Sequence, residues 1–337
     1  MKKIIYNDYF MSEFMFYFLE KKREYDIQSV ANQIKSKKLP LLLKLFMWRV
    51  VPFGYIFLFL VVRCFQKKQM TRLSKDSILY FGVDNIYNLT KLMYGNVDID
   101  RHVLWFWNPI SSLGVNKYDN WVHVYLFIPL LKYAGVQLWS FDKCDVEKHK
   151  LIYHPQIHNS AHLLSYSLPH MTNFKKTFKS DRHSFLFVGK DKGRLKNLIN
   201  VKSILSKSNV DCELYITPDE KGRYSNKDFI LLEEHNLSYI DYLKKVSSHS
   251  GLIDFVQAGQ SGVTLRALEA LYLRKKLITN NHHIKEYDFY HPSNVLFIDE
   301  SMDSEQLLSF LDSSFVDVSP DVLAKYDIND LLNSVFE

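Results

Sequence analysis

The sequence predicts an α/β protein with two domains, each built on a doubly wound parallel sheet. From about residue 76 onward, short apolar stretches of strand length alternate with helical stretches, which is the pattern of parallel βαβ units. The chain has 337 residues, enough for two domains of ordinary size. Hydrophobic residues make up 47% and aromatic residues 15%, so a substantial core is expected and global disorder is excluded.

In the first half of the chain, four short apolar stretches are expected to be strands, and three longer stretches to be helices. The expected strands are residues 1–6, 78–81, 102–107 and 136–140. The expected helices are residues 14–23, 85–94 and 120–133. The last helix is expected to kink at Pro129, because proline removes a helical hydrogen bond.

Ligands of parallel sheets lie beyond the carboxyl ends of the strands. In the first domain, that edge is expected to carry Asp8, Asp84, Asn108 and Asp142.

Residues 155–183 are polar and show little periodicity, so we interpret them as the connection between the domains. A second α/β series follows. Its expected strands are residues 184–188, 212–216, 252–256, 277–279 and 294–298, and its expected helices are residues 195–206, 238–247, 262–272, 304–311 and 329–336. We therefore expect domains at residues 1–165 and 166–310, with a C-terminal helical segment at residues 311–337.

Residues 39–65 form an almost wholly apolar segment with basic flanks. Its longest uncharged run covers only residues 50–62, and Lys44 and Arg49 interrupt the longer window, whereas a spanning helix needs about 20 apolar residues. A transmembrane helix, a buried core segment and an interfacial hairpin on an anionic leaflet are the three alternatives. The last is the expectation that we keep, as peripheral membrane contact.

The remaining composition narrows the function classes only slightly. A net charge of +6 is a mild excess of basic residues, which suits an anionic small ligand, a membrane surface or nucleic acid. Cys64, Cys144 and Cys212 are odd in number and unpaired in spacing, so neither a disulfide framework nor a zinc site is indicated. The apolar start is too short for a signal peptide because Asn7 and Asp8 end it. We therefore expect a cytoplasmic protein.

Residues 252–281 predict an anion site, since they indicate a strand, a glycine-bearing turn, a helix and a second strand. Gly259 and Gly262 allow a tight turn, and Ser261 is the expected N-cap of the helix. Free N–H groups and the helix dipole at such an N-terminus attract phosphate. The residues expected to supply N–H groups and hydroxyls are Ser261, Gly262, Val263 and Thr264.

Five segments resemble a family of bacterial enzymes described as lipopolysaccharide or capsule biosynthesis glycosyltransferases. The segments are WFWNP (105–109), WSFDKCD (139–145), SFLFVGKDKGRL (184–195), DFVQAGQSGVTLRALEALYLRKKLITNN (254–281) and YDFYHPSNVLFI (287–298). The resemblance covers most of the chain from residue 76. It implies the GT-B fold, in which two Rossmann-like domains, one on the acceptor side and one binding a nucleotide-sugar, face each other across a cleft.

The resemblance also implies the reaction, which is transfer of a sugar from a nucleotide-sugar to a glycan or glycolipid acceptor at the inner face of the membrane. No cofactor or metal is expected. Residues 98–100 spell the DxD metal motif of the other glycosyltransferase fold, and we interpret this as a chance occurrence. The alternatives are a GT-B-like nucleotide-sugar epimerase and a non-enzymatic protein that binds anionic lipid or nucleic acid. Nucleic acid is not expected, because the basic residues are spread along the chain.

Lys190, Lys192 and Arg194 follow the first strand of the second domain on a glycine-bearing loop. Three cations at the carboxyl end of a strand suit a diphosphate whose charge grows as the glycosidic bond breaks. A solvated basic turn is the alternative.

Further donor contacts are expected around the helix at residues 262–272. Arg266 and Glu269 are spaced to pair with each other, while the resemblance implies that Glu269 holds the ribose hydroxyls. Asp254 needs a partner if buried, and Arg266 is the candidate. Gln257 and Gln260 are placed to contact the base or the sugar.

The catalytic base is the least determined part of the expected site. Inverting transfer needs a carboxylate or histidine to deprotonate the acceptor hydroxyl, and a retaining enzyme has no need of a dedicated base. The base candidates are Asp8, Asp84 and Asp142, followed by Asp119 and His123. A capping or turn role is the alternative for each.

Overall fold

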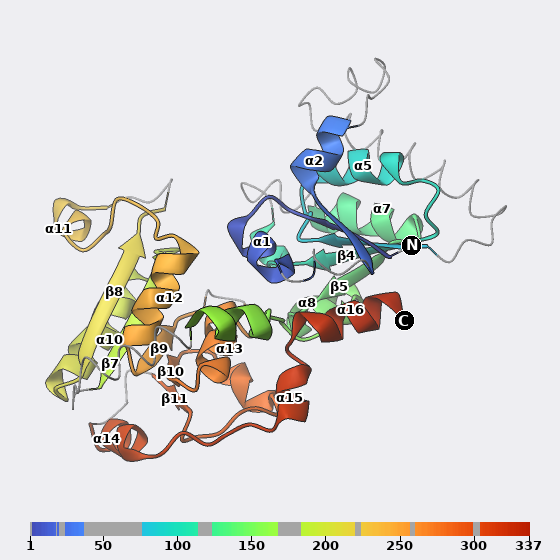
Figure 1. Ribbon diagram of the computed structural model, residues 1–337. Coiled ribbons are helices and arrows are strands. Elements are labelled where there is room, and N and C mark those ends of the chain that lie inside the picture. The colour runs from blue at the N-terminus through green and yellow to red at the C-terminus, as the bar shows by residue number, and fades with distance from the viewer. Residues whose placement is uncertain are drawn as a thin grey trace. The chain divides into compact units, whose positions relative to one another are not determined.

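The computed structural model describes residues 2–17, 19, 24–36, 76–113, 123–167, 183–219, 224–256, 260–298 and 304–337. The chain forms two compact units, drawn in Figure 1. The first comprises Met1–Pro155 with Asn329–Glu337, and the second comprises Gln156–Ile328. This division falls before the boundary that we expected at residue 165, and the C-terminal helix counts with the first unit.

The described part of the first unit contains a six-stranded sheet in the order β2-β1-β3-β4-β5-β6, and every described pair is parallel. The strands are β1 (Lys2–Tyr6), β2 (Tyr25–Ser29), β3 (Ser77–Phe81), β4 (Arg101–Phe106), β5 (Gln137–Ser140) and β6 (Ile152–Tyr153). Apolar side chains of the central strands, such as Ile78, Leu104 and Phe106, are fully buried. The prediction of a parallel α/β sheet is therefore confirmed, although β2 and β6 were not predicted.

The described part of the first unit also contains helices, most of them between consecutive strands. They are α1 (Phe10–Phe16), α2 (Val30–Ser36), α5 (Ile86–Gly95), η1 (Ile110–Ser112), η2 (His123–Phe127), α7 (Ile128–Tyr133), α8 (Lys143–His149) and α16 (Ile328–Phe336). Pro129 is the second residue of α7 and directly follows the π-helical turn η2. The helical stretch is therefore irregular near Pro129, where a kink was expected. Asp330 of α16 contacts His154, with Oδ2 and Nε2 3.1 Å apart, which helps to hold this helix in the first unit.

The second unit contains a five-stranded sheet in the order β11-β10-β9-β7-β8 among its described residues, again with parallel pairs. The strands are β7 (Ser184–Lys190), β8 (Asp211–Thr217), β9 (Gly251–Asp254), β10 (Lys276–Thr279) and β11 (Val295–Phe297). Gly251 begins β9 against the buried ring of Phe185. A Cβ at this glycine would lie 2.2 Å from Phe185 Cε1, so the sheet requires glycine here.

The helices of the second unit match most of the predicted ranges. They are α10 (Leu195–Lys207), α11 (Asn226–Phe229), α12 (Tyr239–Ser248), α13 (Leu265–Tyr272), η3 (His282–Glu286), α14 (Ser304–Asp312) and α15 (Pro320–Ala324). Residues 160–167, which we expected to belong to the connection, are also helical. Ser238 caps α12 by accepting a hydrogen bond from the N–H of Asp241, which is why its start was predictable.

The predicted N-cap of α13 is wrong by three residues. Thr264, and not Ser261, is the N-cap, because its Oγ1 accepts a 3.2 Å hydrogen bond from the N–H of Ala267. Residues 261–264 are therefore a loop that leads into the helix.

No helix within the described ranges is long and apolar enough to cross a membrane. The predicted membrane-contact segment, residues 39–65, lies outside the described residues.

Candidate functional site

The loop after β7 makes a tight turn at the carboxyl edge of the second sheet. Lys192 and Gly193 both have left-handed backbone angles, with φ of 48° and 75°, a conformation that is uncommon for a residue with a side chain. Asp191 closes the turn, since its carboxylate accepts a 2.6 Å hydrogen bond from the N–H of Leu195 at the start of α10. The turn thereby leaves the side chains of Lys190 and Lys192 exposed.

Arg194 follows this turn and ties the end of β7 to the end of β9. Its three guanidinium nitrogens donate to the backbone carbonyls of Asp191 (2.9 Å), Phe255 (2.5 Å) and Lys190 (2.5 Å). Among the described residues, no carboxylate accepts a hydrogen bond from Arg194. Its bonds therefore fix two neighbouring loops, while its positive charge has no ion-pair partner there.

Arg266, in the first turn of α13, also bonds to residues near the carboxyl ends of β7 and β9. Its Nη1 lies 3.0 Å from Oδ1 of the buried Asp254, and its Nη2 donates a 2.5 Å hydrogen bond to the carbonyl of Val188. The guanidinium carbons of Arg266 and Arg194 lie 4.8 Å and 5.1 Å from the ring centroid of Phe187. The expected pairing of Asp254 with Arg266 is confirmed, and one aromatic ring supports both guanidiniums.

The positive charges of Arg194, Arg266 and Lys192, at the carboxyl edge of this sheet, repel one another. Burial, and then the charge of Arg266, lowers the pKa of the Arg194 guanidinium to about 10. The pKa of Lys192 is lowered as well: its side chain reaches solvent, but surrounding protein atoms partly desolvate the amine, and the charge of Arg194 adds to this effect. The carboxylates of Asp254, Asp191 and Asp219 offset part of this effect for Arg194, and Asp219 does so for Lys192, but the net direction for both cations is downward. A bound anion would favour their charged forms, so the strand ends are electrostatically suited to phosphate.

The loop after β9 is positioned by two asparagines that follow β10. The Asn280 side chain accepts a 2.7 Å hydrogen bond from the N–H of Val256. Asn281 Nδ2 donates to the carbonyls of Ser261 and Gly262 at 3.3 Å each. Because these carbonyls are held by Asn281, the loop has a defined path into the N-terminus of α13. Neither asparagine was predicted to have a role, although their place at a strand's carboxyl end was a usable signal.

The other predicted residues of this loop are packed closely. Gln260 Nε2 donates to the carbonyl of Gly262 at 3.4 Å. Ser261, Gly262 and Val263 are buried, and Thr264 is half-buried. Together with the basic turn after β7, they place most of the predicted donor residues at one edge of the sheet.

Glu269 lies elsewhere on α13. Its carboxylate is 2% exposed and accepts hydrogen bonds from the hydroxyls of Tyr239 and Tyr242, each at 2.5 Å. The predicted pairing of Arg266 with Glu269 does not occur, because Arg266 bonds to the strand ends and Glu269 bonds to α12. The donor site and Glu269 are thus on successive turns of one helix.

The three base candidates of the first unit follow β1, β3 and β5, as expected from the sheet order. Asp8 Oδ1 accepts a 3.1 Å hydrogen bond from the N–H of Ala31 at the start of α2. Asp142 is 1% exposed and caps α8 by accepting from the N–H of Asp145 at 3.2 Å. Asp84 is half-buried, three residues after the end of β3. The capping alternative is therefore observed for Asp8 and Asp142.

Asp145 is a buried carboxylate that was not among the predicted site residues. Its Oδ2 accepts a 2.7 Å hydrogen bond from the N–H of Ile110. Burial raises its pKa to about 6, and the negative charge of Asp142 adds to this effect. The carboxylate joins the loop after β4 to the first turn of α8.

Several other predictions fall on the remaining parts of the chain. Asp119 and Gln257 lie outside the described residues, and so does the side chain of His123. Residues 98–100 precede β4, at the amino edge of the first sheet. Across the described parts of the chain, no group of three or more histidine, cysteine, aspartate or glutamate residues is arranged to hold a metal ion.

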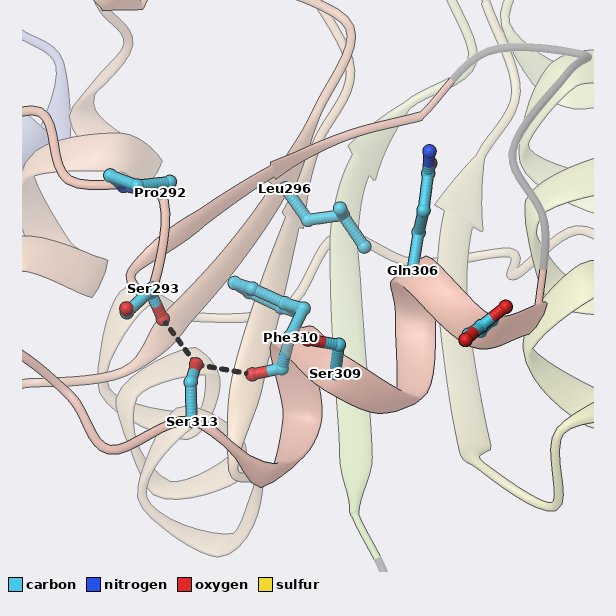
Figure 2. Close-up of a pocket in the computed structure, with 8 residues that line it drawn as sticks. Pro292, Ser293, Leu296, Gln306, Ser309, Phe310 and Ser313 are labelled. Carbon is cyan, nitrogen blue, oxygen red and sulfur yellow. Dashed lines mark hydrogen bonds between the residues drawn. The ribbon is translucent and has the colours of Figure 1, made fainter.

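A cavity of about 500 Å³ lies apart from these loops, between β11 and α14. Figure 2 shows its lining, in which Ser313 donates hydrogen bonds to the carbonyls of Phe310 and Ser293. Lys276 Nζ holds the same corner by donating to the carbonyl of Ser293 at 2.9 Å. The lining has no cationic side chain, so it does not suit a diphosphate.

Comparison with solved structures identifies the fold. The chain matches a glycosyltransferase from Rickettsia africae ESF-5 with a TM-score of 0.54, at 10% identity, over 99% of this chain and 96% of that one. At this identity the match shows the fold alone, which is the GT-B type with two parallel-sheet α/β domains. The predicted fold class is therefore confirmed.

Two other solved structures are less similar. A Listeria monocytogenes protein assigned as a UDP-N-acetylglucosamine 2-epimerase has a TM-score of 0.48 at 12% identity, over 98% of this chain and 94% of that one. WaaG, a glycosyltransferase involved in lipopolysaccharide biosynthesis, has a TM-score of 0.42 at 13% identity, over 79% and 88%. These values carry no inference about this chain. No protein-family model matches the sequence, and no curated protein matches it significantly.

Proposed function

We propose that the chain is a glycosyltransferase that transfers a sugar from a nucleotide-sugar donor to a glycan or glycolipid acceptor in lipopolysaccharide or capsule synthesis. The observation that carries the proposal is the pair of guanidiniums, Arg194 and Arg266, stacked on Phe187 at the carboxyl ends of β7 and β9. Arg194 has no carboxylate partner among the described residues, and Lys192 adds a further cation beside it. A nucleoside diphosphate supplies the charge that this arrangement favours.

The donor-binding residues are proposed to act in two ways. Lys190 and Lys192 lie on the exposed turn after β7 and are proposed to contact the phosphates directly. Arg194 donates three hydrogen bonds and Arg266 two to the protein itself, so they are proposed to act mainly through charge and by holding the loops. Among the described residues, the buried Nε of Arg266 has no hydrogen-bond partner.

The loop at Gln260, Ser261, Gly262, Val263 and Thr264 leads into the N-terminus of α13, and it is proposed to supply N–H groups and hydroxyls. In this scheme, protein cations neutralise the leaving diphosphate, and the enzyme is proposed to be metal-independent.

The acceptor is proposed to bind the first unit, with its hydroxyl deprotonated by one of the carboxylates at the sheet's carboxyl edge. Asp8, Asp84 and Asp142 are the proposed set. Individual asparagine variants would rank them, since the base should lose turnover while donor affinity stays unchanged.

The proposed location is the inner face of the membrane, with residues 39–65 making peripheral contact. Deleting residues 41–62 should release the protein from anionic vesicles and from the membrane fraction, because the apolar and basic segment is then missing. Unchanged fractionation of a folded deletion variant would contradict this location.

Binding of nucleotides tests the central proposal. Isothermal titration with UDP, GDP, CMP and dTDP should identify one that binds, and Lys192→Ala should weaken it by about tenfold, the order of one charge-assisted hydrogen bond. Lys202→Ala, an exposed change on α10, is the matched control and should bind normally. If no nucleotide binds, or if Lys192→Ala binds as the wild type does, the donor site is misassigned.

Product analysis separates transfer from epimerisation, because an epimerase converts the nucleotide-sugar without any acceptor. A steep loss of DNA binding with added salt would instead favour a nucleic-acid binding protein.

A further inference from the structure

Glu269 is a buried charge that the proposed transfer chemistry does not use. Both of its carboxylate oxygens accept hydrogen bonds, Oε1 from the Tyr239 hydroxyl and Oε2 from the Tyr242 hydroxyl, at 2.5 Å each. Burial, and then the negative charge of Glu269, raises the pKa of both tyrosines well above the ordinary value. The two hydroxyls therefore keep their protons and act as donors to the carboxylate.

His158 extends this arrangement beyond the two helices. Its Nε2 lies 3.0 Å from the Tyr239 hydroxyl oxygen and 3.7 Å from Glu269 Oε1. Since the hydroxyl proton of Tyr239 is directed to Glu269, its oxygen is left to accept, and Nε2 of His158 is the donor. The backbone of His158 is itself bonded to Tyr326 and Ile328. The hydrogen bonds around Glu269 therefore join α13 to α12. Through His158 they also join both helices to the segment at residues 326–328.

The position of the carboxylate argues against direct contact with a nucleotide. Glu269 is 2% exposed, and a ribose hydroxyl would have to displace a tyrosine from it. One turn earlier on the same helix, Arg266 bonds to Asp254 and Val188 at the donor edge. Burying a carboxylate costs several kcal/mol, and an apolar side chain would fill such a space without that cost. What the buried Glu269 carboxylate provides, and an apolar side chain would not, is a set of hydrogen bonds that fixes the orientation of α13.

We propose that Glu269 is a positioning residue, which acts through Tyr239 and Tyr242 to set where the N-terminus of α13 meets the donor phosphates. This inference rests on the proposed function, because it concerns the same donor site. It replaces the expected contact of Glu269 with the ribose. The loop that leads into α13 and the Arg266 guanidinium move with the helix, so a shift of its first turn would change every phosphate contact together.

Matched nucleotides distinguish positioning from ribose contact. Titration of the full chain compares UDP with 2′-deoxy-UDP, GDP with 2′-deoxy-GDP, and inorganic pyrophosphate as the probe without a ribose. Glu269→Gln should weaken binding of the preferred nucleotide, its 2′-deoxy form and pyrophosphate by the same factor of about ten, since the phosphate contacts shift as a group. A loss confined to the 2′-hydroxyl form would establish direct ribose contact and overturn the inference.

A second variant and a control separate positioning from loss of stability. Tyr242→Phe removes the hydroxyl donor to Oε2 and should give the same uniform loss, with an effect that does not add to that of Glu269→Gln. Asn294→Ala removes a buried side chain that bonds to Val316 at the far end of β11. It should lower the thermal midpoint without changing nucleotide affinity.

The titrations are made well below the thermal midpoint of every variant, so that a loss of affinity does not reflect unfolding. Normal affinity in Glu269→Gln, or equal loss of affinity in Asn294→Ala, would overturn the positioning role. Failure of the wild type to bind any nucleotide or pyrophosphate would overturn the proposed function, and the positioning role with it.

Discussion

Replacing Arg194 with lysine keeps the charge at the donor edge and removes only the geometry of the guanidinium. The arginine donates to three backbone carbonyls, those of Asp191, Lys190 and Phe255, and it stacks 5.1 Å from the ring centroid of Phe187. A single ammonium cannot reach three acceptors placed around a planar fork. We expect Arg194→Lys to lose at least two of the three hydrogen bonds.

The size of the effect follows from these contacts. Hydrogen bonds from a charged group contribute about 1.5–3 kcal/mol each, and less where water reaches the freed carbonyls. Arg194 is half-buried, so a total loss of about 2 kcal/mol is expected for two bonds. For a domain of this size, that corresponds to a fall of about 4–8 °C in the thermal midpoint.

Urea unfolding and calorimetry of the full chain measure this loss. Lys202→Arg, on the exposed face of α10, is the matched exchange of one basic residue for another and should leave stability unchanged. Nucleotide affinity should also fall in Arg194→Lys, because the two loops are no longer tied together. A variant as stable as the wild type would refute the clamp and leave Arg194 with an electrostatic role alone.

Two further predictions test the fold around the sites. Gly251→Ala should destabilise the second unit by about 1–3 kcal/mol in urea unfolding, as overpacked cores do, since its Cβ would lie 2.2 Å from Phe185, and Phe185→Leu should partly restore it. The raised pKa of Asp145, about 6, means that its contribution to stability is full below its ordinary value of 3.8 and is lost as pH rises through 6. Asp145→Asn keeps an acceptor for Ile110, so it should overtake the wild type between pH 5 and 7; parallel pH profiles would contradict this.

The central strands of the second unit, β7, β9 and β10, were predictable because most of their apolar residues are buried. Residues 184–188 and 277–279 are short apolar runs bounded by glycine or polar residues, and both became parts of strands. Edge strands give a weaker signal. Residues 25–29 of β2 are mostly half-buried, and β6 is exposed, so neither has the apolar run that identifies a central strand.

The contacts of Arg266 show where local spacing fails. A separation of three residues favoured Glu269 as its partner, whereas the structure pairs it with Asp254 and the carbonyl of Val188. Those partners are brought together by the adjacency of β7 and β9, which is a long-range property of the sheet. The start of α13 was missed for a local reason, because Ser261 and Thr264 both have side chains that suit an N-cap, and only the bond to Ala267 decides between them.

In the proposed donor site, the residues that mainly supply positive charge differ from the residue that contacts the phosphates directly. Arg194 donates three hydrogen bonds and Arg266 two to the protein. Both retain their positive charge in a half-buried setting, where salt screens them less than it screens an exposed amine. Lys192 is exposed and offers a direct contact that added salt weakens. Binding of a nucleoside diphosphate should then lose only part of its strength as salt rises, and Lys192→Ala should remove mainly that salt-sensitive part.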